Sequence, residues 1–298
     1  MDALDRNRKK RQLEEIEQLR EVAEQGDVEA QYQLGEHYYN GWTIPQNKEE
    51  AVNWLCKAAE QGHVKAQYLL GSCYNDRNNW DEAAGWFRKA AEQGHARAQF
   101  FLGEYYDRGK GVSKNKEEAA VWYHKSAEQG DTDAQYQIAE CYFKGDGVPQ
   151  DTAEAIEFWR KAAGDSTGYN SGYASYRLAM CYFEGNGVPQ DKEEAVKLLK
   201  QIRSKFCMEA AYMLAECYYN GEGVARDKAK AAEQYLEAAQ WGHAEAQYRL
   251  GKCYLEGEGV RKDKKEAIEW LRRAAPYGLD DERRHKEAAD LLRQIDRQ

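Results

Sequence analysis

The stretch AEQGDVEAQYQLGEHYYNGW, residues 23–42, recurs with small changes along the chain. Copies read AEQGHVKAQYLLGSCY at 59–74, AEQGHARAQFFLGEYYDRG at 91–109 and AEQGDTDAQYQIAECYFKG at 127–145. An alanine two residues before an aromatic residue anchors seven copies in all: Ala30, Ala66, Ala98, Ala134, Ala174, Ala210 and Ala246. Successive anchors are 36, 32, 36, 40, 36 and 36 residues apart, a period typical of solenoids built from repeated helix pairs.

Each copy predicts an amphipathic helix, which we call helix A. Counting from the anchor as position 0, position +4 is leucine or isoleucine and position +5 is glycine or alanine. Positions 0, +4 and +8 form one stripe on a helix, and a small residue at +5 lets a second helix approach closely. Position +8 is always tyrosine: Tyr38, Tyr74, Tyr106, Tyr142, Tyr182, Tyr218 and Tyr254.

A loop and a second helix, helix B, follow helix A. The loop reads KGDGVPQD at 144–151, EGNGVPQD at 184–191, NGEGVARD at 220–227 and EGEGVRKD at 256–263. Its first glycine suits the left-handed position that ends a helix, and its second allows a tight reversal. Asn or Asp then begins helix B, with Glu three residues later in most copies, which predicts a capping box. No segment alternates as a strand would, so the chain is expected to be all-α, with each helix pair stacking on the next.

The pattern A-x-x-x-L-G-x-x-Y-x-x-G-x-G-V-x-x-D-x-x-x-A resembles the Sel1-like repeat family, a relative of the tetratricopeptide repeats, over about residues 20–275. The second repeat lacks the loop, and its short turn NDRNNWDEA at 75–83 is more like a tetratricopeptide repeat. The resemblance implies a right-handed α/α superhelical solenoid of seven helix-turn-helix repeats with terminal capping helices. It also implies an adaptor role, known for this family in bacteria and in eukaryotic protein quality control.

We therefore expect a single α-solenoid over residues 1–298. Residues 1–27 form an N-terminal capping helix, residues 28–278 form seven Sel1-like repeats, and residues 279–298 form a polar C-terminal capping helix.

Composition excludes several classes of protein. The chain has 298 residues, a net charge of -9 and no apolar run of the ~18 residues that a membrane span needs. The charged N-terminus has no apolar signal region, so a cytoplasmic, bacterial protein is expected, with a secreted effector left open. The negative charge argues against nucleic acid as a partner. Five of the seven cysteines share position +7, where stacked repeats hold them too far apart for disulfides, so they are expected to be buried packing residues: Cys73, Cys141, Cys181, Cys217 and Cys253.

The side of helix A that carries positions +2, +3, +6 and +9 points away from the apolar stripe, and we call it the outer face. The resemblance implies that this face lines a concave groove, as in tetratricopeptide-like solenoids. Aromatic anchors with charged neighbours suit a protein-binding surface. The aromatic rows at +2 and +9 could instead pack between neighbouring A helices. The expected protein-binding residues are Tyr32, Glu36, Tyr39, Phe101, Glu104, Asp107, Glu140, Phe143, Phe183, Glu216 and Tyr219.

Two departures from the repeat are further candidates. The insertion Gly164–Tyr173 places two tyrosines among glycine and serine residues, and is either a recognition loop or a tolerated surface insertion. Trp42 replaces a loop residue in the first repeat, and is either an exposed anchor or packs down onto the fold.

No catalytic or metal-binding motif is present, so no enzyme activity, cofactor or metal is expected. His63, His95 and His243 share one repeat position just after a helix-ending glycine, where other copies have aspartate, and this predicts a capping or turn role. The function expected is a non-catalytic scaffold or adaptor for a protein or peptide, with a monomer favoured. An inhibitor or immunity protein that neutralises a partner enzyme is the alternative. Hydrolysis of β-lactams, linked to family members with paired cysteines, is remote because that pairing is absent here.

Overall fold

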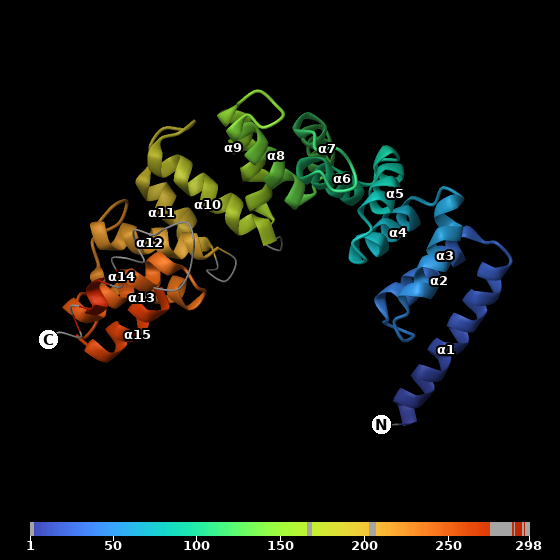
Figure 1. The fold of residues 1–298 in the computed structure, drawn as a ribbon, viewed down its shortest axis with the longest axis horizontal. Helices are drawn as coiled ribbons and strands as arrows, with labels where there is room; N and C mark the ends of the chain where they lie inside the picture. Colours follow the sequence, from blue (N-terminus) through green and yellow to red (C-terminus); the bar gives the residue numbers. More distant parts are fainter. Residues whose placement is uncertain are drawn as a thin grey trace. The chain divides into compact units, whose positions relative to one another are not determined.

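The computed structural model of the chain describes residues 3–165, 169–202, 207–274, 288, 290–293 and 295, and these residues contain no strand. Fifteen helices lie within residues 3–274 (Figure 1). After α1 (Ala3–Glu24), the A helices are α2 (Val28–Asn40), α4 (Val64–Asp76), α6 (Ala96–Arg108), α8 (Thr132–Lys144), α10 (Tyr169–Glu184), α12 (Met208–Asn220) and α14 (Ala244–Glu256). The B helices are α3 (Lys48–Glu60), α5 (Trp80–Glu92), α7 (Lys116–Glu128), α9 (Thr152–Gly164), α11 (Lys192–Gln201), α13 (Lys228–Gln240) and α15 (Lys264–Ala274).

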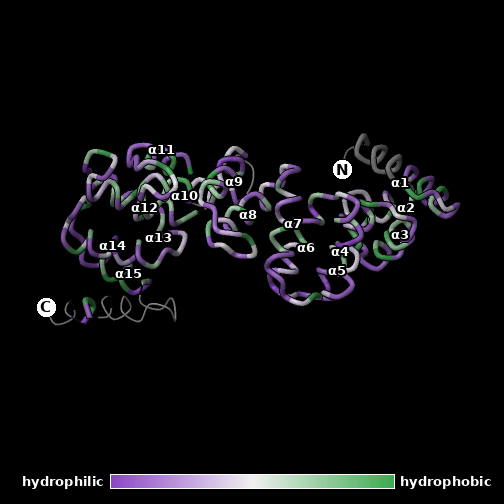
Figure 2. Tube along the Cα trace, turned by 90° about the horizontal axis from the view of Figure 1, so that it is seen from above, coloured by the Kyte–Doolittle hydropathy of each residue, from purple (hydrophilic) through white to green (hydrophobic). Residues whose placement is uncertain are grey.

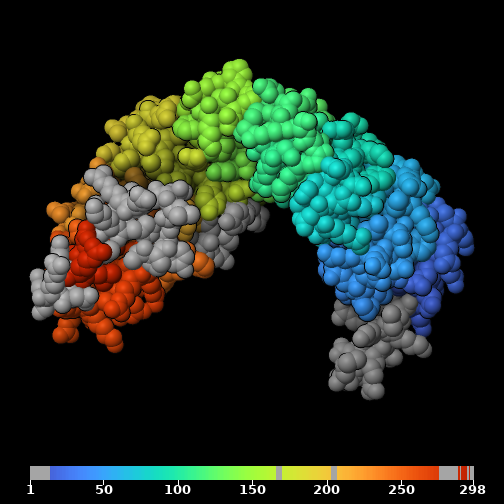
Figure 3. All heavy atoms as spheres, viewed as in Figure 1, coloured from blue at the N-terminus to red at the C-terminus, as the bar shows by residue number. Residues whose placement is uncertain are grey.

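The prediction of an all-α solenoid of seven repeated helix pairs is confirmed. The chain divides into two compact units, residues 1–150 and residues 151–298. Within each unit, every helix packs on the helices that precede and follow it in sequence. In Figure 3 the repeats of one unit accordingly occupy consecutive bands of colour.

Two terminal segments lie outside the seven repeats. At the N-terminal end, Ile16 and Ala23 of α1 pack with Ala30, Leu34 and Trp54 of the first repeat. The predicted C-terminal capping helix, residues 279–298, lies mostly outside the described residues. Of that segment, Ala288 and Ile295 pack with Leu271 of α15.

The small residue at position +5 allows helix B to approach helix A, as predicted. A Cβ added to Gly35, Gly71, Gly103 or Gly251 would lie 2.7 Å from a side-chain atom of the paired helix B. The neighbouring leucine or isoleucine at +4 is buried in every repeat. Since both side chains and backbones meet here, the helix pair has no room for a larger residue at +5.

Buried glutamines at position +1 connect five of the seven A helices to the helix that precedes each of them. They are Gln31, Gln67, Gln99, Gln135 and Gln247. Each Nε2 donates to the carbonyl of an alanine in the last turn of the preceding helix at 3.0–3.3 Å, which satisfies a helix-end carbonyl. Figure 2 shows hydrophilic and hydrophobic residues interspersed along the helices. These hydrogen bonds explain why glutamine follows the anchor alanine in five of the seven copies.

The cysteines form no disulfide bond among the described residues, and those at position +7 are buried or half-buried. Burial raises the pKa of Cys73 to about 12 and that of Cys253 to about 11. A thiol held in its protonated form behaves as a small apolar group. The predicted packing role is confirmed.

The expected loop Gly164–Tyr173 is wrong over residues 169–173, because α10 begins at Tyr169. The insertion lengthens this helix to 16 residues, against 13 for the other A helices, and Tyr173 packs against the core of the next helices. The chain between the two helices, residues 166–168, lies outside the described residues. Trp42 is 79% exposed, so it takes the exposed alternative.

Among the described residues, no helix is long and apolar enough to span a membrane.

Candidate functional site

The histidines at the shared repeat position begin A helices, which confirms the predicted capping role. The Nδ1 atoms of His63, His95 and His243 accept the backbone N–H three residues later at 3.1, 3.2 and 3.1 Å. A neutral imidazole that accepts at Nδ1 carries its proton on Nε2. In His63, Nε2 lies 3.1 Å from the carboxylate of Glu29 on the preceding A helix.

The aromatic row at +2 packs between neighbouring A helices. The rings of Tyr32, Tyr68 and Tyr212 each stack on the capping histidine of the next A helix, with centroids 4.5 Å apart. Tyr32 is only 9% exposed, and its hydroxyl donates to Glu36 at 2.7 Å. Of the two alternatives for this row, packing is the one that the structure shows.

An arginine replaces the histidine stack where the cap is an aspartate. The guanidinium of Arg97 lies 3.2 Å from the capping Asp131 and 2.6 Å from Asp133. It also lies over the ring of Phe100 at 4.6 Å from the centroid. The previous A helix therefore offers a tyrosine ring to each of these capping histidines and a guanidinium to the capping Asp131.

The row at +9 lies beside the first residue of helix B, which is usually lysine. Lys116 Nζ is 2.7 Å from Asp107, and Lys192 Nζ is 4.7 Å from the ring centroid of Phe183. Tyr219 donates to Glu258 of the next repeat at 2.7 Å. Tyr39 is half-buried, and burial, aided by the negative charge of Asp76, raises its pKa to about 12.

The acidic residues of the outer face have partners within the chain. Glu104 pairs with Arg108 at 2.9 Å, and burial raises the pKa of Glu104. Glu216 accepts from the hydroxyl of Tyr235 and lies 3.5 Å from Arg249. Glu140 is 8% exposed and pairs with Lys144 at 2.8 Å. These carboxylates are thus held in place by neighbouring cations and hydroxyls.

Four apolar side chains at +3 and +6 are half-buried on the outer face. They are Leu69, Phe101, Met180 and Met213. Phe101 stacks on the fully buried Phe87 with centroids 5.0 Å apart, and one flank contacts Tyr68. Of these four, only Phe101 was among the expected site residues. The other three could have been found by comparing the +3 and +6 positions across repeats.

The expected site residues divide between the two units. Eight lie in residues 1–150, on α2, α6 and α8, and these include the half-buried Phe143, whose carbonyl accepts from Gln150 at 2.9 Å. The other three lie on α10 and α12 in residues 151–298. Within the part of the chain that is described, no three His, Cys, Asp or Glu side chains gather as metal ligands would.

Comparison with known families identifies the repeats. The Sel1 repeat model matches residues 28–63, 96–131, 132–164, 172–202, 209–243 and 244–275, and a tetratricopeptide repeat model matches residues 46–94. The chain belongs to the Sel1 repeat family, whose fold generally mediates protein interactions and is usually non-catalytic. The tetratricopeptide match confirms the predicted character of the second repeat.

Solved structures share the fold. The chain is 31% identical to c5321, a protective antigen of uropathogenic Escherichia coli, with a TM-score of 0.84 over 94% of this chain and 59% of that one. It is 32% identical to a Sel1 repeat protein from Oxalobacter formigenes, with a TM-score of 0.74 over 95% of this chain and 80% of that one. The immunity protein PA5088 from Pseudomonas aeruginosa is 24% identical, with a TM-score of 0.39 over 73% of this chain and 74% of that one. No curated protein sequence is significantly similar to this chain.

Proposed function

We propose that the chain is a non-catalytic adaptor that binds a protein or peptide segment along the outer faces of its A helices. The observation that carries this proposal is the set of half-buried apolar residues at +3 and +6. They lie on A helices whose positions relative to the neighbouring repeats are fixed by the tyrosine–histidine stacks and by the contacts between consecutive repeats.

The outer face of α4 and α6 is arranged for binding before any partner arrives. Phe101 lies flat on the buried Phe87, and the guanidinium of Arg97 lies 5.2 Å from its ring centroid. A ring held in this way loses little conformational freedom when a partner covers it. Leu69 is half-buried on the preceding A helix, α4, and Arg97 and Glu104 of α6 supply charged groups on the same face as Phe101. Such a combination of apolar centre and polar rim suits protein recognition.

The outer face of α10 and α12 offers methionines instead of rings. Met180 and Met213 are half-buried there, and Glu216 of α12 lies 3.5 Å from Arg249 of α14. Methionine side chains are flexible and fill irregular surfaces. This face therefore suits partners whose apolar side chains differ in shape.

The test compares a charge placed on the outer face with the same charge placed on helix B. Leu69→Glu puts a carboxylate among the apolar residues of α4 and α6. Val121→Glu is the matched control, because Val121 is a 47% exposed apolar residue on α7. Partners are captured from the native host, identified by mass spectrometry, purified and titrated against both variants. We expect Leu69→Glu to weaken binding at least about tenfold, or about 1.4 kcal/mol, and Val121→Glu to bind as wild type does.

Equal binding by Leu69→Glu, in a protein with an unchanged melting temperature, would move the binding site away from this face. The captured set also separates two roles. Several partners support a general adaptor, and one stoichiometric enzyme that loses its activity on binding supports a dedicated inhibitor.

A further inference from the structure

The third to seventh repeats each dock onto the repeat before them through a Gly-x-Gly loop. The second glycine of the loop lies against the first residue of the preceding helix B. A Cβ added to Gly147 would lie 2.0 Å from the carbonyl oxygen of Lys116, so only glycine fits. The described junctions of this kind pair Trp80 with Gly111, Lys116 with Gly147, Thr152 with Gly187, Lys192 with Gly223, and Lys228 with Gly259.

The residue between the two glycines complements the first residue of that helix B. Where helix B begins with lysine, the loop supplies a carboxylate: Lys116 lies 3.3 Å from Asp146, Lys192 lies 2.9 Å from Glu222, and Lys228 pairs with Glu258. At the two remaining junctions the loop residue and the first residue of helix B also complement each other, but without an ion pair. Trp80 receives Lys110, whose Nζ lies 4.4 Å from the ring centroid, and the uncharged Thr152 faces the loop of the uncharged Asn186.

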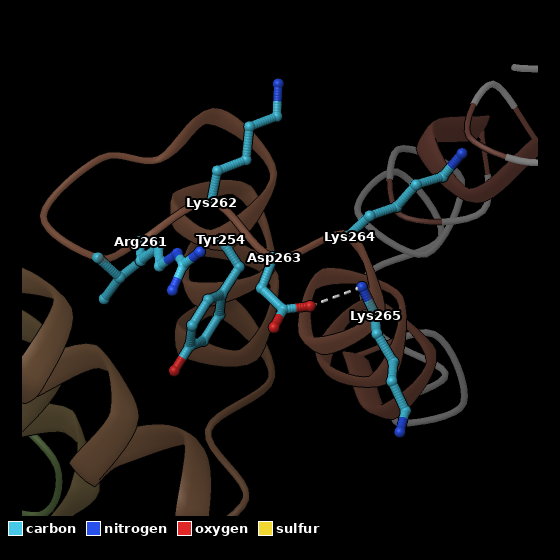
Figure 4. A pocket seen from close by; sticks show the side chains of 7 residues that line it. Tyr254, Arg261, Lys262, Asp263, Lys264 and Lys265 are labelled. Carbon is cyan, nitrogen blue, oxygen red and sulfur yellow. Dashed lines mark hydrogen bonds between the residues drawn. The ribbon is translucent and has the colours of Figure 1, made fainter.

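The corresponding surface at the start of α15 has no such loop docked on it among the described residues. We define the terminal socket as Tyr254, Val260 and residues 261–265, which line an open concavity of about 830 Å³ at the start of α15 (Figure 4). Lys264 is the first residue of α15, as Lys228 is of α13. Among the described residues no loop covers Lys264 and no carboxylate pairs with it. In Figure 4 its side chain extends away from Asp263, which instead caps α15 by accepting from the backbone N–H of Lys265 at 2.9 Å.

The charge of the terminal socket departs from that of the other repeats. Arg261, Lys262, Lys264 and Lys265 are all exposed and make no ion pair with a described residue. Other B helices that begin with lysine carry Glu or Ala at the position of Lys265. Acidic residues are favoured in the first helical turn, so lysine here is unfavourable for the helix itself. In a chain of net charge -9, this cluster is complementary to a carboxylate.

We infer that the terminal socket is an interaction surface for a partner protein segment that places an aspartate or glutamate between two glycines. Lys264 takes the carboxylate as Lys192 takes Glu222, and the partner's second glycine lies on the backbone at the start of α15. A loop of this kind from a second Sel1-repeat protein has the required chemistry. This surface is separate from the outer faces of the A helices.

The inference is tested with the full chain and a peptide copied from its own loop, YNGEGVARD, residues 219–227, with blocked ends. The peptide is titrated to millimolar concentration against isotope-labelled protein, and amide chemical shifts are followed. Saturable shifts confined to residues 254–265 are expected. Affinity should fall at least about tenfold in Lys264→Glu, and also when the peptide carries Gln in place of Glu.

Lys114→Glu is the matched control, because it makes the same charge change at an exposed lysine outside the terminal socket. It should weaken binding less than about threefold. Absence of saturable shifts, or equal affinity for Lys264→Glu and wild type, would overturn the inference. Binding that appears only after Asp280, Asp281 and Glu282 are changed to Asn, Asn and Gln would also overturn it, because the chain's own acidic run would then be the occupant.

Discussion

At the scale of single residues, the capping position shows how much of the structure the sequence could predict. The alternation of His and Asp after a helix-ending glycine predicts a cap, and both types accept the same backbone N–H three residues later. The stack of His95 on Tyr68 could not be predicted, because the two residues belong to different repeats. Only the distance between neighbouring A helices brings their rings together.

His95 should make the protein sensitive to acid. Burial, with Lys65 nearby, lowers the pKa of His95 in the folded protein below its ordinary value. The neutral cap therefore stabilises the fold above a pH of about 6.5, and this contribution is lost as the pH falls below that value, because the unfolded chain takes up the proton more readily. His95→Asp keeps an acceptor at the cap without this titration.

We expect the free energy of unfolding of His95→Asp, relative to wild type, to rise by about 1 kcal/mol between about pH 7.5 and about pH 5. Urea denaturation of both proteins across this range measures the difference. A difference that does not change with pH would contradict the neutral Nδ1 cap.

Gln67 tests the buried glutamines. Its amide donates to the carbonyl of Ala59 at 3.1 Å and its oxygen accepts from Gln93 at 2.7 Å. Gln67→Leu leaves both groups without this partner in a buried site, and should lower the free energy of unfolding by about 2 kcal/mol. Gln33→Leu, on the exposed side of the previous A helix, is the control and should change stability by less than about 0.5 kcal/mol. Equal changes in the free energy of unfolding for Gln67→Leu and Gln33→Leu would show that burial of the Gln67 amide does not contribute to stability.

At the scale of helices and loops, the period and the glycines predicted nearly every element. The exception is the start of α10, where the insertion before Tyr173 was expected to form a loop. Glycine and serine in the insertion suggested a turn, but the packing of Tyr173 and Tyr176 against the neighbouring core favours helix. Tertiary packing overrides local preference in this way because most helix stability comes from the buried face.

The two loop glycines of the fourth repeat should differ in their tolerance of a side chain. Gly145 and Gly147 both have φ of 74°, so alanine is strained at either position. A Cβ at Gly145 would lie 3.3 Å from Gln150 Cβ, whereas at Gly147 it would meet the carbonyl oxygen of Lys116. We expect Gly145→Ala to cost about 1 kcal/mol and Gly147→Ala about 3 kcal/mol, measured by chemical denaturation. Equal costs would contradict the docking of the loop on the preceding repeat.

At the scale of the whole molecule, the seven predicted repeats are confirmed as seven helix pairs; the Sel1 model matches six of them and the tetratricopeptide model matches the second. The outer face of helix A could be predicted from periodicity, but the accessibility of its rows could not. Tyr32 of the +2 row and Tyr219 of the +9 row make contacts between neighbouring repeats, so +3 and +6 are the rows for which we propose contact with a partner. The periodicity within one helix predicts which way each side chain points, but only the spacing between helices determines how exposed that side chain is.

The most direct test of the proposed function is site-specific photocrosslinking in the native host. The photoreactive residue p-benzoylphenylalanine is placed at position 69 on α4 or at position 121 on α7, and crosslinked proteins are identified by mass spectrometry. The account predicts that a specific partner crosslinks from position 69 and not from position 121. Crosslinks from position 121 alone would contradict it.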